Sequence, residues 1–337
     1  MRCLQSGAVV SVPASLRLST AWRLCVLLFA VGAPGENGAL AQAYPSKPVR
    51  IVVASGAGGG DDFATRVVAS KLSEMFGQQF IVDNRPGAGG FIGQSYVAKS
   101  APDGYTLLLG GGSMAGARYV NASVNYDVLR DFTHISLIET APFVLVAHPS
   151  VPARNVKEYI ALARSRPGKL TYATIGAGQI PYWSVVLFNS MARVSAVEVQ
   201  YKGTGEALIG VISGEVDYTF TAAVAAVTNR AKLRVLAVTT AKRSPMLPDV
   251  PAMTEALPGY EMPAWRSILG PAGMRREIVD SLNNAIGRVL TMPDLRDLFL
   301  KAGSEPLASS PEELQKRYAD WIVIFGKLAK EAGLKPQ

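Results

Sequence analysis

The chain contains very little cysteine and histidine. Among its 337 residues there are two cysteines, Cys3 and Cys25, and two histidines, His134 and His148. Both cysteines fall in an N-terminal leader described below, so we expect a mature chain without disulfide bonds. Tight transition-metal sites are built mainly from clustered cysteine and histidine. The composition therefore predicts no metal site and no cofactor, and it leaves few groups for catalysis.

Long apolar runs are also missing. The apolar stretch Leu24–Val31 is far shorter than the roughly 18 residues that a membrane span requires. It follows a basic region with Arg2, Arg17 and Arg23, and it precedes small residues at 39–43. This arrangement is typical of a secretory signal peptide. We predict that residues 1–43 are a signal peptide and that the mature chain begins near Gln42 or Tyr44.

Positive charge is present but not clustered. The formal net charge is +8, and it falls to +6 without the leader, which carries three arginines and one glutamate. No basic cluster is longer than the pairs Lys242-Arg243 and Arg275-Arg276. Because nucleic-acid-binding proteins concentrate lysine and arginine on one surface, we predict no nucleic-acid partner. A mild positive charge favours small acids as ligands.

The glycine motifs of nucleotide-binding and hydrolytic enzymes are incomplete. The loop G-A-G-G-G-D that begins at Gly56 lacks the last glycine of G-x-G-x-x-G. The segment Gly111–Ala115 approaches the nucleophile elbow G-x-S-x-G but ends in alanine. A hydrolase that uses Ser113 with His148 and an aspartate, or Thr204, is one alternative. We predict instead a protein that binds without catalysing a reaction, with no catalytic residue.

The most informative feature that is present is a strand, a glycine loop and a helix in succession. The β-branched run Val49–Val53 leads into the glycine-rich segment 56–60, and a helical pattern begins at Asp61 or Asp62. Glycines let the main chain approach a ligand closely. The free N–H groups of the following helical turn favour an anion. This unit predicts a cradle for a small ligand.

Strand and helix signals alternate along most of the chain. We predict strands at 49–54, 79–82, 106–109, 142–147, 170–174, 197–201, 216–221 and 235–239, and helices at 62–76, 90–99, from 155, around 183–191, at 204–213, between the last two strands, at 277–290 and at 311–328. Such alternation predicts an α/β fold with mostly parallel sheets and helices on both faces. Loops at 55–62, 110–116, 175–179 and 202–205 follow predicted strands, where such sheets bind ligands. Two loops in each half predict two lobes facing each other across a cleft.

Seven motifs, in order, together carry a family resemblance. They are Tyr44-Pro-Ser-Lys-Pro-Val-Arg50, the Gly-Gly-Gly-Asp-Asp loop, Asp83-Asn-Arg-Pro-Gly-Ala-Gly-Gly90, Ala101-Pro-Asp-Gly-Tyr-Thr-Leu-Leu108, Pro167-Gly-Lys-Leu-Thr-Tyr-Ala173, Tyr201-Lys-Gly-Thr-Gly205 and Ala241-Lys-Arg-Ser-Pro-Met-Leu-Pro-Asp-Val-Pro251. In this order and spacing the chain resembles the tripartite tricarboxylate transporter receptor family, the Bug or TctC-like proteins.

The resemblance implies a two-lobed, type II-like periplasmic binding protein. Lobe 1 would be 44–144 plus 268–337, lobe 2 would be 145–267, and the crossings would fall near 143–146 and 265–269. The family captures small carboxylates by lobe closure and delivers them to membrane transporter subunits, one large and one small. A monomeric periplasmic receptor is therefore implied. A sensor that presents its liganded form to a membrane signalling protein is the alternative.

The resemblance and the loops together predict a ligand site of backbone amides and small hydroxyls. Its predicted members are Ser55, Gly58, Gly59, Asp61, Asp62, Gly112, Ser113, Thr174, Gly176, Ala177, Gln179, Lys202, Gly203, Thr204, Gly205 and Thr221. The ligand itself stays open between a dicarboxylate, an amino acid and an aromatic or N-heterocyclic acid.

Several positions depart from the family pattern and leave alternatives open. Asp61 stands where the family has Ser or Thr; it either serves with Asp62 as a helix cap and dipole complement or faces the cleft and repels a second carboxylate. Arg85 is either a clamp on the glycine turn or a ligand contact. Thr221 stands where many relatives carry an acid, which counts against a simple amino-acid ligand.

Two further predictions concern the second half of the chain. Lys202 is either a solvated loop charge or a cation that orients the ligand. Tyr182 and Trp183 either form an aromatic wall of the site or pack inside their helix.

Overall fold

A computed structural model describes residues 44–176 and 178–336. The predicted signal peptide, both cysteines and Ala177 lie outside the described residues. Within the described ranges no helix combines the length and apolar character needed to cross a membrane.

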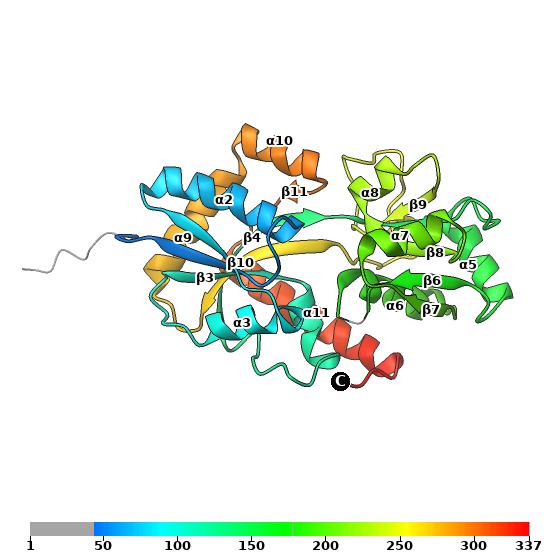
Figure 1. Ribbon diagram of the computed structural model, residues 1–337, viewed down its shortest axis with the longest axis horizontal. Helices are drawn as coiled ribbons and strands as arrows, with labels where there is room; N and C mark the ends of the chain where they lie inside the picture. Colours follow the sequence, from blue (N-terminus) through cyan, green and yellow to red (C-terminus); the bar gives the residue numbers. More distant parts are fainter. Residues whose placement is uncertain (1–43, 177, 337) are drawn as a thin grey trace, which may run out of the picture. The chain divides into compact units, whose positions relative to one another are not determined.

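The first sheet has six strands in the order β11-β4-β10-β3-β1-β2 (Figure 1). Its strands are β1 (Val49–Val53), β2 (Phe80–Asn84), β3 (Thr106–Gly111), β4 (Phe132–Ala141), β10 (Ala264–Pro271) and β11 (Glu305–Pro306). Strand β1 pairs in parallel with β2 and β3, whereas β10 is antiparallel to β3 and β4. The β-branched sequence of β1 suits a strand covered on both faces.

Helices cover both faces of the first sheet. Ile51 and Val53 pack in a core with α2 (Gly60–Phe76), α9 (Arg276–Leu290) and α10 (Pro293–Ala302). Val52 points to the opposite face, because side chains alternate along a strand. There it packs in a core with α3 (Phe91–Ala98), α4 (Ser113–Gly116) and α11 (Pro311–Glu331).

The second sheet has five strands in the order β7-β6-β8-β5-β9. Its strands are β5 (Phe143–Ala147), β6 (Thr171–Thr174), β7 (Val197–Gln200), β8 (Tyr218–Ala222) and β9 (Arg234–Val238). Strand β6 is parallel to β7 and β8, whereas β5 is antiparallel to β8 and β9. Its helices are α5 (Val156–Ser165) and α6 (Ile180–Ala192) on one face and α7 (Thr204–Ile212) and α8 (Ala223–Thr228) on the other.

The two sheets share one strand order. Without β11, the first sheet reads β2-β1-β3-β10-β4, and the second reads β7-β6-β8-β5-β9. In both, the fourth position holds an inserted antiparallel strand, β10 or β5, and the other strands follow the order second, first, third and fourth along the chain. The inserted strand of each sheet, β10 or β5, is the one that the chain forms just after it leaves the other sheet. The first lobe is therefore built from both ends of the chain. The predicted architecture, two α/β lobes, is confirmed.

One detail of the prediction is wrong. The sheets are mixed rather than mostly parallel, because each accepts an inserted antiparallel strand. The predicted crossings, near 143–146 and 265–269, fall at β5 and β10, the inserted strands of the second and first sheets. By the strand limits, the chain leaves the first sheet at Pro142 and leaves the second sheet between the end of β9 and Ala264.

Most predicted elements are present with ends shifted by a few residues, but β4 and β10 were not predicted. Helix α5 begins as its capping pattern requires, with the Asn155 side chain accepting a 2.9 Å hydrogen bond from the Glu158 N–H. Strand β4 carries buried side chains on both faces, so it shows no alternating pattern. Strand β10 contains Arg266, Gly270 and Pro271, which are uncommon in strands.

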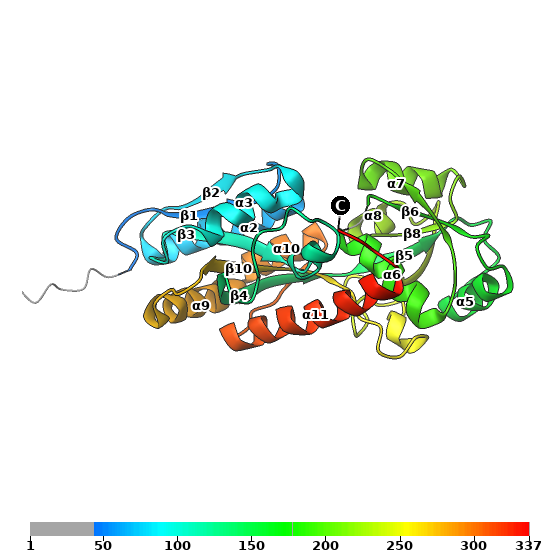
Figure 2. The same cartoon turned by 90° about the horizontal axis from the view of Figure 1, so that it is seen from below.

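Helix α11 joins the two lobes. It contacts β4 and α4 of the first lobe and α6 of the second (Figure 2). Aromatic rings continue along this route: Trp265 contacts Trp321, Trp321 contacts Phe325, and the Phe325 ring lies 4.6 Å from that of Trp183. One hydrophobic cluster thus extends from the first sheet to the second. It is a contact between the lobes in addition to the two chain crossings.

Candidate ligand-binding site

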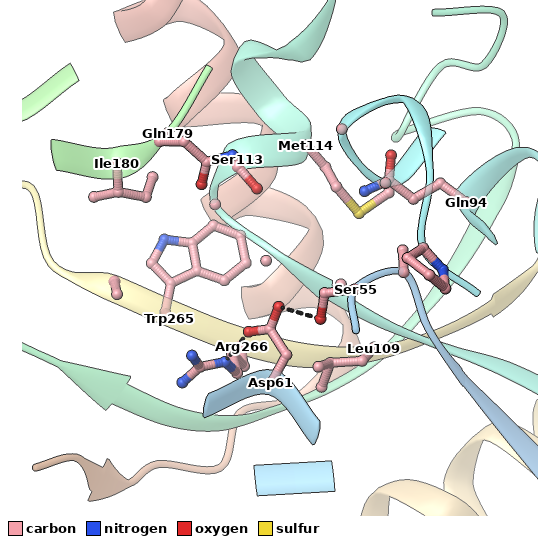
Figure 3. Close-up of a pocket in the computed structure, with 18 of the residues that line it drawn as sticks. Ser55, Asp61, Gln94, Leu109, Ser113, Met114, Gln179, Ile180, Trp265 and Arg266 are labelled. Atoms are coloured by element: carbon pink, nitrogen blue, oxygen red, sulfur yellow. Dashed lines mark hydrogen bonds and ion pairs between the residues drawn. The ribbon is translucent and has the colours of Figure 1, made fainter. Parts of the chain in front are cut away.

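A cavity of about 440 Å³ lies between the lobes. The first lobe lines it with the loop after β1, the glycine turn before α3, the end of β3 and the start of β10. The second lobe contributes Phe143 and the first residues of α6, from Gln179 to Pro181. We call this space the central cavity (Figure 3).

A smaller space of about 160 Å³, the second-lobe cavity, lies beside it. Phe143 and Pro181 line both cavities, so the two spaces adjoin. The second-lobe cavity is lined by the ends of β6 and β8 and the first turn of α7. Its polar groups are the hydroxyls of four threonines: Thr174, Thr204, Thr219 and Thr221. None of the described residues that line it is charged.

The charged part of the central cavity is a network of three side chains. Arg266 on β10 donates from Nε to Asp61 Oδ1 at 2.6 Å and from Nη1 to Glu139 Oε1. Glu139 is opposite Arg266 in the β4–β10 register, so the sheet itself brings the two together. Ser304 Oγ donates to the other Glu139 oxygen at 2.5 Å. Asp61 also accepts from Ser55 Oγ at 3.1 Å.

This network carries one net negative charge. Burial lowers the pKa of the Arg266 guanidinium, but the charges of Glu139 and Asp61 more than offset this and raise it overall. The arginine therefore stays protonated beside two carboxylates. Figure 3 shows the Asp61 carboxylate between Ser55 and Arg266, below the indole of Trp265.

Backbone close to the cavity is held by aromatic packing. A side chain at Gly112 would clash with the Trp321 ring and lie 3.1 Å from Trp265 Nε1, so glycine is required there. Trp265 itself is 2% exposed, and its Nε1 has no hydrogen-bond partner among the described residues. Because Gly112 has no side chain, the turn after β3 can lie against these rings and line the cavity with its main chain.

The predicted site residues divide into three groups. The central cavity is lined by Ser55, Asp61, Gly112, Ser113 and Gln179. The second-lobe cavity is lined by Thr174, Thr204, Gly205 and Thr221. Outside both lie Gly58, Gly59, Asp62, Gly176, Lys202 and Gly203, and Ala177 is not among the described residues.

The two neighbouring aspartates have different surroundings. Neither is a helix cap, because the N-cap of α2 is Gly59 and both lie in the first turn. Asp62 is buried and accepts from Arg66 Nε and from the Gly58 N–H, both at 3.0 Å; these bonds lower its pKa to about 2. It holds the glycine loop. Asp61 faces the cleft as one hypothesis proposed, but it is paired with Arg266, which that hypothesis did not include.

Other open alternatives are also decided. Arg85 pairs with Asp83 at 2.8 Å and stacks on Tyr96, which favours the structural interpretation. Lys202 is exposed and lies outside both cavities. Tyr182 and Trp183 are both buried in the core and line neither cavity, which favours the alternative of helix packing over that of an aromatic wall. Trp265 and Phe143 supply the aromatic lining instead.

The histidines do not support a catalytic triad. His148 Nδ1 lies 2.6 Å from Ser150 Oγ, and His134 packs against the Tyr318 ring. Ser113 therefore has neither histidine as its base. Across residues 44–176 and 178–336 there is no group of three or more histidines, cysteines, aspartates or glutamates that could hold a metal ion.

Four residues of the site and its charged network were not predicted from the sequence: Phe143, Glu139, Trp265 and Arg266. Arg266 and Glu139 lie on β10 and β4, the two strands that were not predicted. Only the register between β4 and β10 brings Arg266 and Glu139 together, so no local sequence motif predicts the pair. The resemblance placed crossings near 143–146 and 265–269, and residues beside a crossing are candidate cleft residues. This was the one usable signal, and it covers Phe143, Trp265 and Arg266.

Two α/β lobes with a common strand order and a cavity lined from both define a two-lobed solute-binding protein. The chain belongs to a particular family of that class: the model of the tripartite tricarboxylate transporter family receptor matches residues 64–334. This confirms the resemblance.

Three relatives illustrate the membership. The UPF0065 protein in the tcbD-tcbE intergenic region of Pseudomonas sp. (strain P51) is 34% identical, over 86% of this chain and 87% of its own. The solved structure of R. palustris Rpa4515 with adipate is 36% identical with a TM-score of 0.74, covering 87% of this chain and 100% of its own. MatC (Rpa3494) from Rhodopseudomonas palustris with bound malate is 30% identical with a TM-score of 0.70, covering 85% and 100%.

Proposed function

We propose that this protein is a receptor that captures a small carboxylate-bearing metabolite between its lobes and delivers it to a tripartite tricarboxylate-type transporter. Family membership and the cavity lined from both lobes support this. The relatives with adipate and with malate support a carboxylate ligand. A ligand that contacts both lobes stabilises the closed form and shifts the population toward it.

The same proposal includes the setting in which the receptor works. Residues 1–43 are the signal peptide, the mature chain is periplasmic and monomeric, and its membrane partner has one large and one small subunit. The lobe limits are those predicted, 44–144 with 268–337 and 145–267, moved by a few residues so that β5 and β10 stay whole.

The carboxylate of the ligand binds in the second-lobe cavity. The observation that carries this is the Thr221 hydroxyl: the residue is 6% exposed, it lines the cavity, and its hydroxyl has no hydrogen-bond partner among the described residues. The neighbouring Thr219 hydroxyl, by contrast, donates to the Ala173 carbonyl at 2.8 Å. A hydroxyl that lines the cavity and is not used inside the protein is available to a ligand.

The first turn of α7 adds donors to the same cavity. Its N-cap, Gly203, has no capping side chain, and Thr204 and Gly205 line the cavity. Free N–H groups at a helix start favour an anion. Each hydrogen bond to a charged group contributes about 1.5–3 kcal/mol, and a helix terminus adds about 0.3–1 kcal/mol. Three or four such contacts, less the cost of association, correspond to micromolar binding.

Titration calorimetry with small mono- and dicarboxylates tests the proposal. We expect the purified protein to bind at least one of them, and Thr221→Val to weaken that binding about tenfold or more, as the loss of a hydrogen bond to a charged group implies. Thr219→Val, on the same strand and in the same cavity, is the matched control, since its hydroxyl is already used inside the protein. Equal losses in both variants would contradict the carboxylate position; no binding of any acid would contradict the proposed function.

A further inference from the structure

The charged network at the first-lobe wall of the central cavity contains one more carboxylate than cations. Asp61 and Arg266 are the charged residues among its described lining residues. Arg266 is shared with Glu139, whose side chain is 2% exposed. One cation between two carboxylates leaves one negative charge uncompensated.

The position of the three groups decides which of them a ligand meets. Arg266 lines both the central cavity and a separate space beside Gly60 and Ser304, whereas Glu139 lines only the second of these. The Asp61 side chain is 45% exposed, against 24% for that of Arg266. A ligand in the central cavity therefore meets more of the Asp61 carboxylate than of Arg266, which lies beside it (Figure 3).

Asp61 retains capacity to accept further hydrogen bonds. Its two oxygens accept one bond each, from Arg266 and from Ser55. A carboxylate has about four acceptor positions, so two remain for a ligand. A donor placed there is satisfied, whereas a second carboxylate brings like charges together in a partly desolvated site.

We infer that Asp61, backed by the Arg266–Glu139 pair, makes this receptor select an acid with one carboxylate and a hydrogen-bond donor at its other end, an ammonium, amide or ring N–H, over a dicarboxylate. The inference rests on the proposed function, which places the carboxylate in the second-lobe cavity. Because the two subsites belong to opposite lobes, the donor and the carboxylate are separated along the ligand. An ω-amino or ω-amide acid fits this arrangement, and an α-amino acid does not.

A matched ligand series isolates the end group. Adipate, 6-aminohexanoate and hexanoate share a six-carbon chain, and succinate, 4-aminobutyrate and butyrate share a four-carbon chain. In calorimetric titrations we expect the amino acid of at least one length to bind at least tenfold more tightly than its dicarboxylate. The apolar acid should lie between them, because it gains no donor contact and suffers no charge repulsion.

Asp61→Asn tests the residue. It keeps the shape and removes the charge, so the preference for the amino acid over the dicarboxylate should fall by tenfold or more, mainly through tighter dicarboxylate binding. The affinity for the apolar acid should change less than threefold. Asp62→Asn is the matched control: it removes the neighbouring carboxylate, which is buried and lies outside both cavities, and should leave the preference unchanged.

The outcomes separate this inference from the proposed function. A dicarboxylate that binds as tightly as its amino analogue, or an Asp61→Asn preference equal to that of the wild type, would overturn the inference and leave the receptor function intact. Failure of all six acids to bind would count against the receptor function and, with it, against the inference.

Discussion

The two lobes share a strand order but present different chemistry to the cleft. In each lobe the inserted antiparallel strand lines the central cavity, through Trp265 and Arg266 of β10 in the first and through Phe143 of β5 in the second. The first-lobe strand introduces a buried ion network, and the second-lobe strand introduces an aromatic ring. The topology thus fixes where the cleft walls lie, and the side chains on the inserted strands fix what each wall recognises.

The difference extends to how each wall depends on its neighbours. Asp61, Arg266, Glu139 and Ser304 come from four separate segments of the chain and satisfy one another. The second-lobe threonines act one by one: Thr219 bonds to the backbone, Thr174 bonds to Glu198, and Thr221 is left for a ligand. Charged networks are costly when partly satisfied, so we expect changes in the first wall to cost stability and changes in the second to cost affinity.

The largest effect that we expect is a loss of stability in Arg266→Gln, which disrupts the charged wall of the first lobe. The substitution leaves Glu139 buried without its cation, which typically costs about 3–5 kcal/mol. Denaturant unfolding should show a loss of about 3 kcal/mol, since Ser304 still donates to Glu139. Adding Glu139→Gln should recover most of it.

A second-lobe ion pair is the control for that experiment. Arg230 and Asp249 form a pair whose side chains are about half exposed, and exposed pairs contribute little to stability. Arg230→Gln should therefore change stability little. An Arg266→Gln loss no larger than that of Arg230→Gln would show that Glu139 does not depend on this arginine.

The two histidines, one in each lobe, allow the lobes to be compared through the pH dependence of stability. His134 is 6% exposed, and burial lowers its pKa to about 4. In the unfolded chain a histidine has a pKa near 6.5, so between about pH 6.5 and 4 the unfolded state binds the proton and the folded state does not. Stability should fall as pH drops through that window, by about 3 kcal/mol in total.

His134→Phe should flatten this pH dependence in unfolding titrations, because it removes the imidazole whose pKa is lower in the folded state than in the unfolded state. His148→Gln is the comparison variant of the second lobe, and it removes a histidine whose Nδ1 lies 2.6 Å from Ser150 Oγ. An unchanged slope in His134→Phe would assign the pH dependence to other groups. The comparison uses slopes rather than absolute stabilities, since either substitution can shift the baseline.

The features that could be predicted from the sequence are local in the chain, and those that could not be predicted depend on contacts between distant segments. The strand β1, the glycine loop and α2 could be predicted because β-branched residues, glycines and helical periodicity are adjacent in the chain. Thr221, which lines the second-lobe cavity, could be proposed from sequence because it closes a predicted strand, 216–221, whose pattern is visible. Arg266 and Glu139 are 127 residues apart, and their contact depends on the register of two strands without alternation. No short-range rule encodes that register.

Ser55→Ala gives the smallest expected effect and tests the finest detail of the charged wall. The hydroxyl donates to Asp61 Oδ2 at 3.1 Å, and both residues line the central cavity. Without it, Asp61 has one more free acceptor position and its charge is less compensated. Because such a bond contributes about 0.5–1.5 kcal/mol, the preference for an amino acid over the matched dicarboxylate should rise about threefold, measured by the same calorimetric titrations. Ser113→Ala, another hydroxyl of this cavity, is the control and should leave the preference unchanged. A lowered preference in Ser55→Ala would mean that the serine assists the ligand donor rather than competing with it for Asp61.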